Sequence, residues 1–405
     1  MSNICDSVNS SARILHAAML PAERPSGQNC RCLEFFYFDA GGGHRSAAMA
    51  LREVINERYP HWSVDLVNLQ ELLKPIDPVS RLTQRKMLSQ SIYNRYLKTG
   101  LTYGSGLFLR ILQKGIQSNS IAIQNQLEQH WRCSQPDLVV SLIPNFNGLM
   151  FQALRRIHPK IPYVTVMTDL ADCPPHFWQE QQDQYLICGD EEAVRQAQAI
   201  GYRPERILRT SGMILRPCFY REDTRDRETE RNKHGLDPTK VTALVMFGGY
   251  GSKLSATIVD RLNDAGLPIQ SMVLCGHHEP LRRQLQGKTS CLAVGFTDNI
   301  PYYMRLADFF IGKPGPGCLS EAIHMGLPVI IEHNQRTLLQ ERFNATWVQQ
   351  REVGIVVRSF NQIDKAVRSL LREQRLEAFR DNVRRFHNRA VYEIPALFAQ
   401  MMGAS

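Results

Sequence analysis

The chain has 405 residues, which exceeds what one hydrophobic core usually covers, so we expect two domains. Hydrophobic residues make up 43% and charged residues 21%, as in ordinary soluble globular proteins, and no apolar run reaches the roughly 18 residues that a membrane-spanning helix needs. The net charge of +9 favours an anionic partner and excludes nothing else.

The first 32 residues are rich in Ser, Asn and small residues, with one short apolar patch and no basic stretch before it. This composition favours a loosely ordered leader over residues 1–32 rather than a secretory signal. The ten cysteines form no CxxC pair and no Cys/His pair at zinc-finger spacing. We therefore expect reduced thiols and a cytoplasmic protein.

Short apolar runs alternate with helical patterns in the first half of the chain. The predicted strands cover residues 34–38, 64–68, 138–142, 163–168 and 184–188, and the predicted helices cover 47–58, 148–157 and 191–200. This alternation is typical of a doubly wound parallel sheet with helices on both faces. It predicts an N-terminal Rossmann-like domain over residues 33–217.

The first predicted strand runs into Gly41, Gly42 and Gly43, which are followed by His44 and a helical run. Glycines let the backbone turn tightly and approach a ligand, and the helix start directs free N–H groups and its positive dipole end at the turn. The spacing fits neither the GxGxxG fingerprint nor the Walker loop. His44 is therefore expected at the carboxyl edge of the sheet, where α/β folds bind ligands. The alternative is a structural turn whose histidine only caps the helix.

Residues 78–127 contain no Asp or Glu, and their basic residues are interleaved with aromatic and aliphatic ones. Such a mixture suits an anionic membrane surface, where each Lys or Arg adds about 1 kcal/mol. It also suits single-stranded nucleic acid, although no nucleic-acid recognition fold is evident. A solvated helix face packed over the domain is the alternative without a function. Arg81, Arg85 and Lys86 are the candidate membrane-binding residues.

A second series of elements follows a charge-rich segment, which we interpret as an interdomain linker over residues 218–238. The predicted strands cover residues 241–247, 270–275, 291–294, 309–311, 329–331 and 354–357, and the predicted helices cover 253–264, 280–285, 300–305, 317–325 and 338–350. They predict a C-terminal Rossmann-like domain over residues 239–385. A final helical stretch is expected to break near residues 392–395, and residues 386–405 are expected to pack back on the N-terminal domain.

Two further glycine turns link a strand to a helix in the second half. They contain Gly248, Gly249 and Ser252 in the first turn, and Gly315, Pro316 and Gly317 in the second. Each is a backbone nest suited to a phosphate. Glu321 follows the second turn by one helical turn, where its carboxylate can accept hydrogen bonds from ribose hydroxyls. An ordinary acid on a helix surface is the alternative.

Two Rossmann-like halves with a cleft between them describe the GT-B architecture, which several nucleotide enzymes share. The chain resembles family 28 glycosyltransferases, and among them the monogalactosyldiacylglycerol synthases and diacylglycerol glucosyltransferases, over about residues 35–357. The residues that carry this resemblance are 41–45, 168–178, 212–217, 294–296 with Asn299 and Met304, and 313–317 with Glu321. The peptidoglycan N-acetylglucosaminyltransferase is also similar, but residues 168–178 favour the diacylglycerol enzymes.

The resemblance implies an inverting transfer of galactose or glucose from a UDP-sugar to the hydroxyl of 1,2-diacylglycerol, giving a β-glycoside. The acceptor hydroxyl must lose its proton as it attacks, because its pKa lies far above neutrality. His44 is the expected base, and Asp169 is the rival base or the group that orients the histidine. Another lipid or polyprenyl acceptor, a UDP-sugar epimerase and a non-catalytic sensor are the alternatives.

By the same resemblance, Phe296 lies beside the uracil, and Gln340, Glu341 and Asn344 contact the sugar or the diphosphate. The chain has no Asp-x-Asp pair, so no metal or other cofactor is expected. The two glycine turns and their helix dipoles would stabilise the negative charge of the leaving UDP instead.

Diacylglycerol stays in the bilayer, so the resemblance also implies peripheral association with an anionic membrane from the cytoplasmic side. Gly42 and Gly43 are expected at the acceptor side of the cleft. Phe177 and Trp178 are expected near its mouth, where they would pack against acyl chains, although an aromatic pair is often part of a core. The sequence leaves the choice between galactose and glucose and the oligomeric state open.

Overall fold

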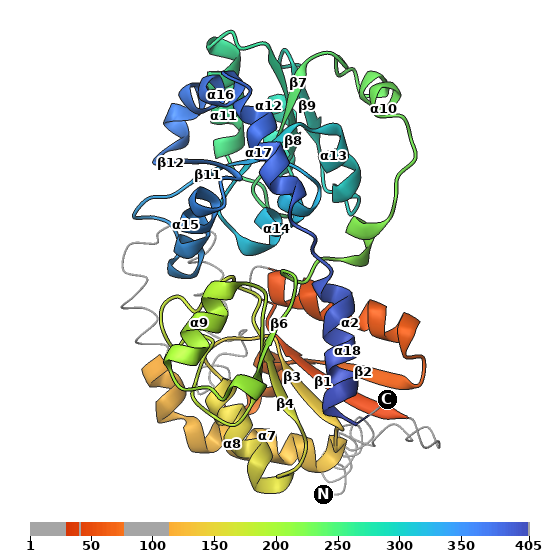
Figure 1. The fold of residues 1–405 in the computed structure, drawn as a ribbon, viewed down its shortest axis with the longest axis vertical. Helices are drawn as coiled ribbons and strands as arrows, with labels where there is room; N and C mark the ends of the chain where they lie inside the picture. Colours follow the sequence, from red (N-terminus) through yellow and green to blue (C-terminus); the bar gives the residue numbers. More distant parts are fainter. Residues whose placement is uncertain (1–29, 40–41, 77–112, 404–405) are drawn as a thin grey trace, which may run out of the picture.

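The computed structural model describes residues 30–39, 42–76 and 113–403. The chain forms two lobes, and each contains a six-stranded parallel sheet with helices packed around it (Figure 1). The prediction of two doubly wound α/β domains is confirmed at this level.

The N-terminal sheet has the strand order β2-β1-β3-β4-β5-β6. Its strands are β1 (Arg31–Tyr37), β2 (Trp62–Asn68), β3 (Leu138–Ser141), β4 (Tyr163–Val166), β5 (Tyr185–Cys188) and β6 (Ile207–Arg209). In β1, Phe35 lies opposite Leu66 of β2 on one side and Val140 of β3 on the other. The chain changes its direction of progress through the sheet between β1 and β3, which is where open α/β sheets bind ligands.

Neighbouring residues of β1 serve two separate cores, because successive side chains of a strand point to opposite faces. Phe35 packs with the apolar face of α2, which repeats Leu51 and Ile55 at helical spacing, and Phe36 packs with Trp131 of α7. The helices of this lobe are α2 (Gly43–Arg58), α3 (Leu69–Leu72), η1 (Lys74–Ile76), α7 (Ser120–Ser134), α8 (Asn147–Ile157), α9 (Glu191–Ala199) and η2 (Pro204–Arg206).

The C-terminal sheet has the order β12-β11-β10-β7-β8-β9. Its strands are β7 (Val241–Met246), β8 (Ile269–Leu274), β9 (Cys291–Val294), β10 (Phe309–Gly312), β11 (Val329–Glu332) and β12 (Gly354–Val357). This is the order of the dinucleotide-binding Rossmann sheet, and its switch point lies between β7 and β10. Both glycine turns of the second half follow these two strands.

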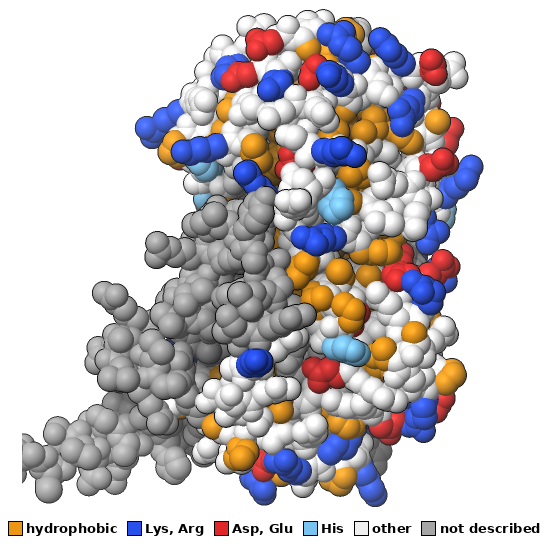
Figure 2. Space-filling model, turned by 90° about the vertical axis from the view of Figure 1, so that its left-hand side faces the viewer, with side chains coloured by type: hydrophobic (Ala, Val, Ile, Leu, Met, Phe, Trp, Pro, Cys, Tyr) orange, Lys and Arg blue, Asp and Glu red, His pale blue; other side chains and the backbone are white. Residues whose placement is uncertain are grey.

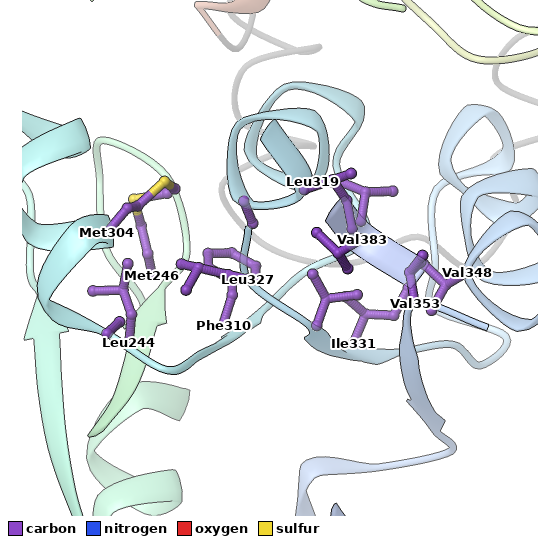
Figure 3. Close-up of a cluster of buried hydrophobic side chains, with 14 of the residues drawn as sticks. Leu244, Met246, Met304, Phe310, Leu319, Leu327, Ile331, Val348, Val353 and Val383 are labelled. Carbon is purple, nitrogen blue, oxygen red and sulfur yellow. The ribbon is translucent and has the colours of Figure 1, made fainter. Parts of the chain in front are cut away.

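Helices cover both faces of this sheet. They are α10 (Arg227–Lys233), α11 (Leu254–Asp264), α12 (Glu279–Leu285), α13 (Ile300–Leu306), α14 (Pro316–His324), η4 (Leu339–Glu341), α15 (Arg342–Gln350), η5 (Phe360–Gln362), α16 (Ile363–Leu371) and α17 (Arg375–Arg384). Figure 3 shows one of the resulting cores, in which Leu319 of α14 and Val383 of α17 lie together above Ile331 of β11. This packing fixes α14, whose first residues form the second glycine turn.

The chain crosses between the lobes twice, at η3 (Pro217–Tyr220) and just before the last helix, α18 (Ala390–Met401). α18 packs on α2 of the first lobe, and the rings of Phe398 and Phe35 lie 5.9 Å apart. At the second crossing, the side-chain amide of Asn388 donates to the carbonyl of Met213 at 2.8 Å. A hydrogen bond thus joins the second crossing segment to the residues that immediately precede the first crossing segment.

The structure differs from the sequence-based expectations in several places. β6, α3 and α7 were not predicted. The last helical stretch is interrupted between α16 and α17 and again before Ala390, whereas α18 runs through Pro395, because its apolar face is buried against α2. Part of the predicted linker is α10, whose buried Arg231 donates to Asp308 at 2.7 Å and so packs on the C-terminal lobe.

α7 shows why it was missed. Its apolar positions Ile123, Leu127 and Trp131 recur every fourth residue and are buried. The first two fall inside the acid-free stretch 78–127, for which a membrane-binding segment and a helix packed over the domain were both open. From residue 120 onward the second alternative is confirmed, because α7 packs on the sheet. None of the helices in the described part of the chain is long and apolar enough to cross a membrane.

Candidate active site

Residues at the carboxyl ends of the two sheets approach each other at the waist between the lobes. Burial raises the pKa of Asp169 and of Cys173 in the N-terminal lobe, and residues of the other lobe contribute: the charge of Glu341 in η4 adds to the shift of Asp169, and that of Arg342 opposes the shift of Cys173. The loop after β4 therefore faces η4 and the start of α15. Figure 2 shows apolar and histidine side chains gathered at this waist.

His44 is the second residue of α2 and lies two residues after the N-cap Gly42, whose φ of 81° is a left-handed conformation that glycine adopts without strain. Its Nδ1 lies 3.1 Å from Oγ1 of Thr168, and its ring lies 5.9 Å from that of Trp178. Burial lowers the pKa of His44 to about 4. A hydrogen bond to the Leu142 backbone favours the protonated ring and opposes part of this shift. The imidazole is therefore neutral at physiological pH, and His44 as a whole residue is partly exposed.

Asp169 follows Thr168 and is almost completely buried, at 6% exposure. Its Oδ2 accepts the indole N–H of Trp178 at 2.8 Å. Burial raises the pKa of Asp169 to about 7, the Trp178 bond opposes this shift, and the charges of Glu341 and Asp172 add to it. Trp178 thus lies between the two candidate bases, with its ring beside His44 and its N–H on Asp169.

The loop that carries Trp178 is organised by Asp172. Its two carboxylate oxygens accept the backbone N–H groups of His176 at 2.7 Å and Trp178 at 2.6 Å, and its own N–H donates to Gln196 of α9. This arrangement turns the chain so that the indole of Trp178 points inward.

Trp178 is fully buried and Phe177 is 7% exposed, and both belong to a core with Leu186 and Ala197. The expectation that these two rings pack against acyl chains at the mouth of a cleft is therefore wrong. They are core residues, because the Asp172 turn and the Asp169 hydrogen bond draw the pair into the lobe.

The first glycine turn of the C-terminal lobe is packed tightly against the end of β8. A Cβ atom on Gly276 would lie 2.1 Å from the carbonyl oxygen of Gly249, and one on Gly251 would lie 2.4 Å from that of Cys275. Gly248 adopts a φ of 78°, and the N–H of His277 donates to the Gly249 carbonyl at 2.8 Å. The turn is thus a rigid backbone structure in front of α11.

Ser252 ends this first turn. Its Oγ accepts the N–H of Leu254 at 3.2 Å, so in this structure it satisfies one of the free donors at the start of α11.

The second glycine turn forms the start of α14. The N-cap is Gly315, which has no side chain to cap the helix. Pro316 is the first helical residue, and Gly317 is exposed. The first N–H groups of the helix, which have no partner within it, are presented together with the positive dipole end. This is the geometry that favours an anion.

Three of the predicted donor-binding residues lie around this turn. The side-chain amide of Asn344 is buried and donates to the carbonyl of Pro314 at 2.7 Å, and Glu341 lies 3.4 Å from Nζ of Lys313. Gln340 precedes Glu341 in η4. The charge of Glu341 raises the pKa of Lys313.

Glu321 lies further along α14 and is partly buried, and burial raises its pKa to about 7, although the positive charge of Arg216 opposes the shift. Phe296, which follows β9, is 54% exposed and stacks on the ring of His277 at 4.0 Å with 14° between the planes. This aromatic pair forms a flat surface beside the first glycine turn.

Three contacts were not expected from the sequence: Thr168 with His44, His277 with Phe296, and Trp347 with Asp190. Thr168 begins the segment 168–178 that carries the family resemblance, but no role was predicted for it. Each contact joins segments remote in sequence, so no local pattern marks it. Arg81, Arg85 and Lys86 lie outside the described residues. In the described part of the chain, no group of three or more His, Cys, Asp or Glu side chains is arranged to hold a metal ion.

Two family models match the chain and together cover most of it. A model of monogalactosyldiacylglycerol (MGDG) synthase matches residues 44–213, and one of the glycosyltransferase family 28 C-terminal domain matches residues 242–388. The first match begins at His44, and the second contains both glycine turns of the C-terminal lobe.

Characterised relatives match over most of the chain. It is 28% identical to the chloroplastic monogalactosyldiacylglycerol synthase of Spinacia oleracea, with 87% of this chain and 69% of that protein covered. It is 29% identical to monogalactosyldiacylglycerol synthase 1 of Arabidopsis thaliana, with 81% and 62% covered. It is 28% identical to the processive diacylglycerol beta-glucosyltransferase of Bacillus licheniformis, with 86% and 88% covered. The chain thus spans about two thirds of the length of these plant relatives.

Solved structures share the fold at low sequence identity. MurG of Acinetobacter baumannii matches with a TM-score of 0.59 at 11% identity, over 91% of this chain and 99% of that one. MnaA of S. aureus, solved with UDP, matches with a TM-score of 0.61 at 14% identity, over 93% and 98%. These structural similarities show the GT-B fold, which enzymes of different activities share. The family models and the named relatives show the family: the chain belongs to glycosyltransferase family 28 and is a glycosyltransferase.

Proposed function

We propose that this enzyme transfers galactose or glucose from a UDP-sugar to the free hydroxyl of 1,2-diacylglycerol at a membrane surface, with inversion at the sugar. The observation that carries the proposal is the match of residues 44–213 to the MGDG synthase model, because it covers the lobe that contains His44 and Asp169. The named relatives are a galactolipid synthase and a diacylglycerol glucosyltransferase, so both sugars stay open.

The donor would bind to the C-terminal lobe at the switch point between β7 and β10. The two glycine turns there, each at the start of a helix, supply backbone N–H groups and positive dipole ends for the diphosphate. The exposed Phe296 ring suits the uracil face, and Glu321 suits the ribose hydroxyls. The buried Asn344 would act through the second glycine turn, because its side-chain amide holds the carbonyl of Pro314.

The acceptor hydroxyl would attack the anomeric carbon as the bond to UDP breaks. A single displacement inverts that carbon, and the hydroxyl proton passes to a base on the acceptor lobe. The negative charge that develops on the diphosphate would be stabilised by the two helix starts, which need no reorganisation during the reaction.

Accessibility favours His44 over Asp169 as this base. A base must first be within reach of the proton, and only then does its pKa decide its efficiency. His44 is partly exposed, whereas Asp169 is 6% exposed and its Oδ2 is occupied by Trp178. The low pKa of His44 keeps the imidazole unprotonated before the reaction, but it also makes the ring a weaker base than a group that titrates near the working pH, so the pKa itself does not favour His44. In its ionised form, Asp169 would favour the imidazolium that forms, because a nearby carboxylate stabilises a positive charge.

The decisive experiment incubates the purified protein with diacylglycerol in anionic vesicles and offers UDP-galactose and UDP-glucose separately. A glycolipid product with a β linkage would establish the reaction and name the sugar. Release of UDP without a glycolipid would contradict the diacylglycerol acceptor and point to another lipid or polyprenyl alcohol.

A UDP-sugar epimerase is the second candidate. The observation in its favour is that UDP-GlcNAc 2-epimerase of Neisseria meningitidis shares the fold, with a TM-score of 0.58 at 12% identity. That likeness shows the fold alone. Conversion of the UDP-sugar without any acceptor would support this candidate and contradict the transferase.

A further inference from the structure

α15 links the donor side of the C-terminal lobe directly to the acceptor lobe. Asn344, in its first turn, donates to the carbonyl of Pro314 at the second glycine turn, at 2.7 Å. Trp347, three residues on, donates its indole N–H to Oδ2 of Asp190 in the N-terminal lobe, at 2.8 Å. Residues three apart lie on one face of a helix, so a single short segment carries both contacts.

The Trp347–Asp190 contact is buried at both ends, with exposed fractions of 7% and 9%. Asp190 is also the N-cap of α9, where its Oδ1 accepts the N–H of Glu192 at 2.9 Å. One carboxylate therefore serves both lobes, with one oxygen for its own helix and the other for the partner lobe. Figure 1 shows α15 at the edge of its lobe that faces α9.

Neighbouring contacts define the same alignment. The ring of Trp347 lies 5.3 Å from that of Phe386, where the chain crosses back to the first lobe. One turn further along α15, Arg351 pairs with Glu191 at 3.3 Å. That pair is exposed and adds little on its own, because solvent screens it. The buried indole contact is thus the specific one.

We propose that Trp347 and Asp190 are positioning residues for the transfer, which hold the donor segment of η4 and α15 in register with the acceptor lobe. This inference rests on the proposed function, because it assumes a donor on one lobe and an acceptor on the other. Misplacement of reacting groups by about 1 Å can cost a hundredfold in rate, so a contact that fixes the register of two lobes acts on kcat. Loss of this contact would leave the residues that bind the donor in place, so the affinity for UDP should not change.

Two variants separate this contact from its surroundings. Trp347→Phe removes the N–H and keeps an aromatic ring. Asp190→Ser keeps an oxygen that caps α9 but cannot also serve Trp347. Trp62→Phe is the matched control, because Trp62 is similarly buried, at 8% exposure, and stacks on Tyr59 away from the interface.

We expect Trp347→Phe and Asp190→Ser each to lower kcat about tenfold, while the dissociation constant of UDP measured by calorimetry stays within about twofold. Asp190→Ser also removes the ion pair of Asp190 with Arg351 at 4.0 Å, so the double variant should be no slower than Asp190→Ser alone, because both substitutions break the Trp347–Asp190 contact. Trp62→Phe should leave kcat unchanged. Unchanged kcat in both single variants, multiplied losses in the double variant, or a parallel loss of UDP affinity would overturn the proposal.

Hydrogen exchange provides a readout that needs no transfer. UDP should slow amide exchange in α14 and, through α15, at the start of α9. In Trp347→Phe the protection of α14 should remain and that of α9 should be lost; equal protection of α9 in both proteins would contradict the coupling. If the wild-type protein binds UDP with this pattern but makes no glycolipid, the proposed function fails and the coupling between the lobes stands.

Discussion

Oγ1 of Thr168 lies 3.1 Å from Nδ1 of His44, although 124 residues separate the two in sequence. His44 comes from the turn after β1 and Thr168 from the loop after β4, so the parallel sheet alone brings them together. This contact fixes the ring of the proposed base, and Trp178 then joins the histidine to Asp169.

Replacement of His44 tests the base. We expect His44→Gln to lower kcat by about 10²- to 10⁴-fold, because general-base assistance contributes that much. UDP affinity should not change, since the turn after β1 belongs to the acceptor lobe. The exposed His61→Gln is the matched control. A variant at His44 with wild-type kcat would show that the histidine is not the base, and the structure already excludes the cap, because α2 has no side-chain cap hydrogen bond.

Replacement of Thr168 tests the orientation of the ring. Thr168→Val keeps the shape and removes the hydroxyl, so kcat should fall about fivefold to twentyfold, as for the loss of one hydrogen bond. Thr168→Ser keeps the hydroxyl and should retain most of the activity. The measurement is kcat with diacylglycerol vesicles over a range of pH. Equal rates in the Val and Ser variants would show that the hydroxyl plays no part.

The raised pKa of Asp169 predicts a dependence of stability on pH. The unfolded carboxyl releases its proton near pH 4, but the folded one holds it until about pH 7. The folded state therefore loses stability as pH rises from 4 to 7, and the cost is constant above that range. Asp169→Asn should be more stable than the wild type at pH 8, by on the order of 4 kcal/mol, and no more stable at pH 4.

Denaturant unfolding at several pH values measures this difference. The exposed Asp264→Asn controls for the loss of one negative charge. A stability gain for Asp169→Asn that is the same at pH 4 and pH 8 would contradict the buried, proton-binding carboxyl.

Charge reversal at Arg81, Arg85 and Lys86 tests membrane binding. The triple Glu variant should bind anionic vesicles at least a hundredfold more weakly, because each basic residue near the surface contributes about 1 kcal/mol. UDP affinity should stay the same, and vesicles without anionic lipid should show little difference between the two proteins. An equal loss of vesicle binding and UDP binding would mean that the variant is misfolded or that these residues serve the donor.

The proposed role of the two helix starts predicts that transfer does not depend on a divalent cation. Glycolipid formation should be unchanged, within about twofold, when a chelator replaces the cation in the assay. Full loss of transfer with the chelator, and recovery with added Mg²⁺ or Mn²⁺, would refute this expectation.

Local patterns in the sequence were enough to place most strands and the three glycine turns. Apolar runs bounded by glycine gave β7 and β10, and the helical runs behind them gave α11 and α14. Hydrophobic periodicity failed at α7 because its apolar positions had a second interpretation as part of a basic, lipid-binding stretch. It also failed at Trp178, where an aromatic residue in a polar loop gives no sign of whether the loop turns inward.

Periodicity, glycine turns and short motifs are local properties, so they were sufficient to predict the two-domain α/β organisation, the family and the residues that flank each ligand-binding turn. Which of those residues meet depends on the packing of the folded chain. The strand orders put His44 and the two donor turns at switch points, the Asp172 turn buried Trp178, and the packing of the lobes joined Trp347 to Asp190. Such contacts form when segments that are distant in sequence pack together, and a local sequence pattern does not show which distant segments will meet.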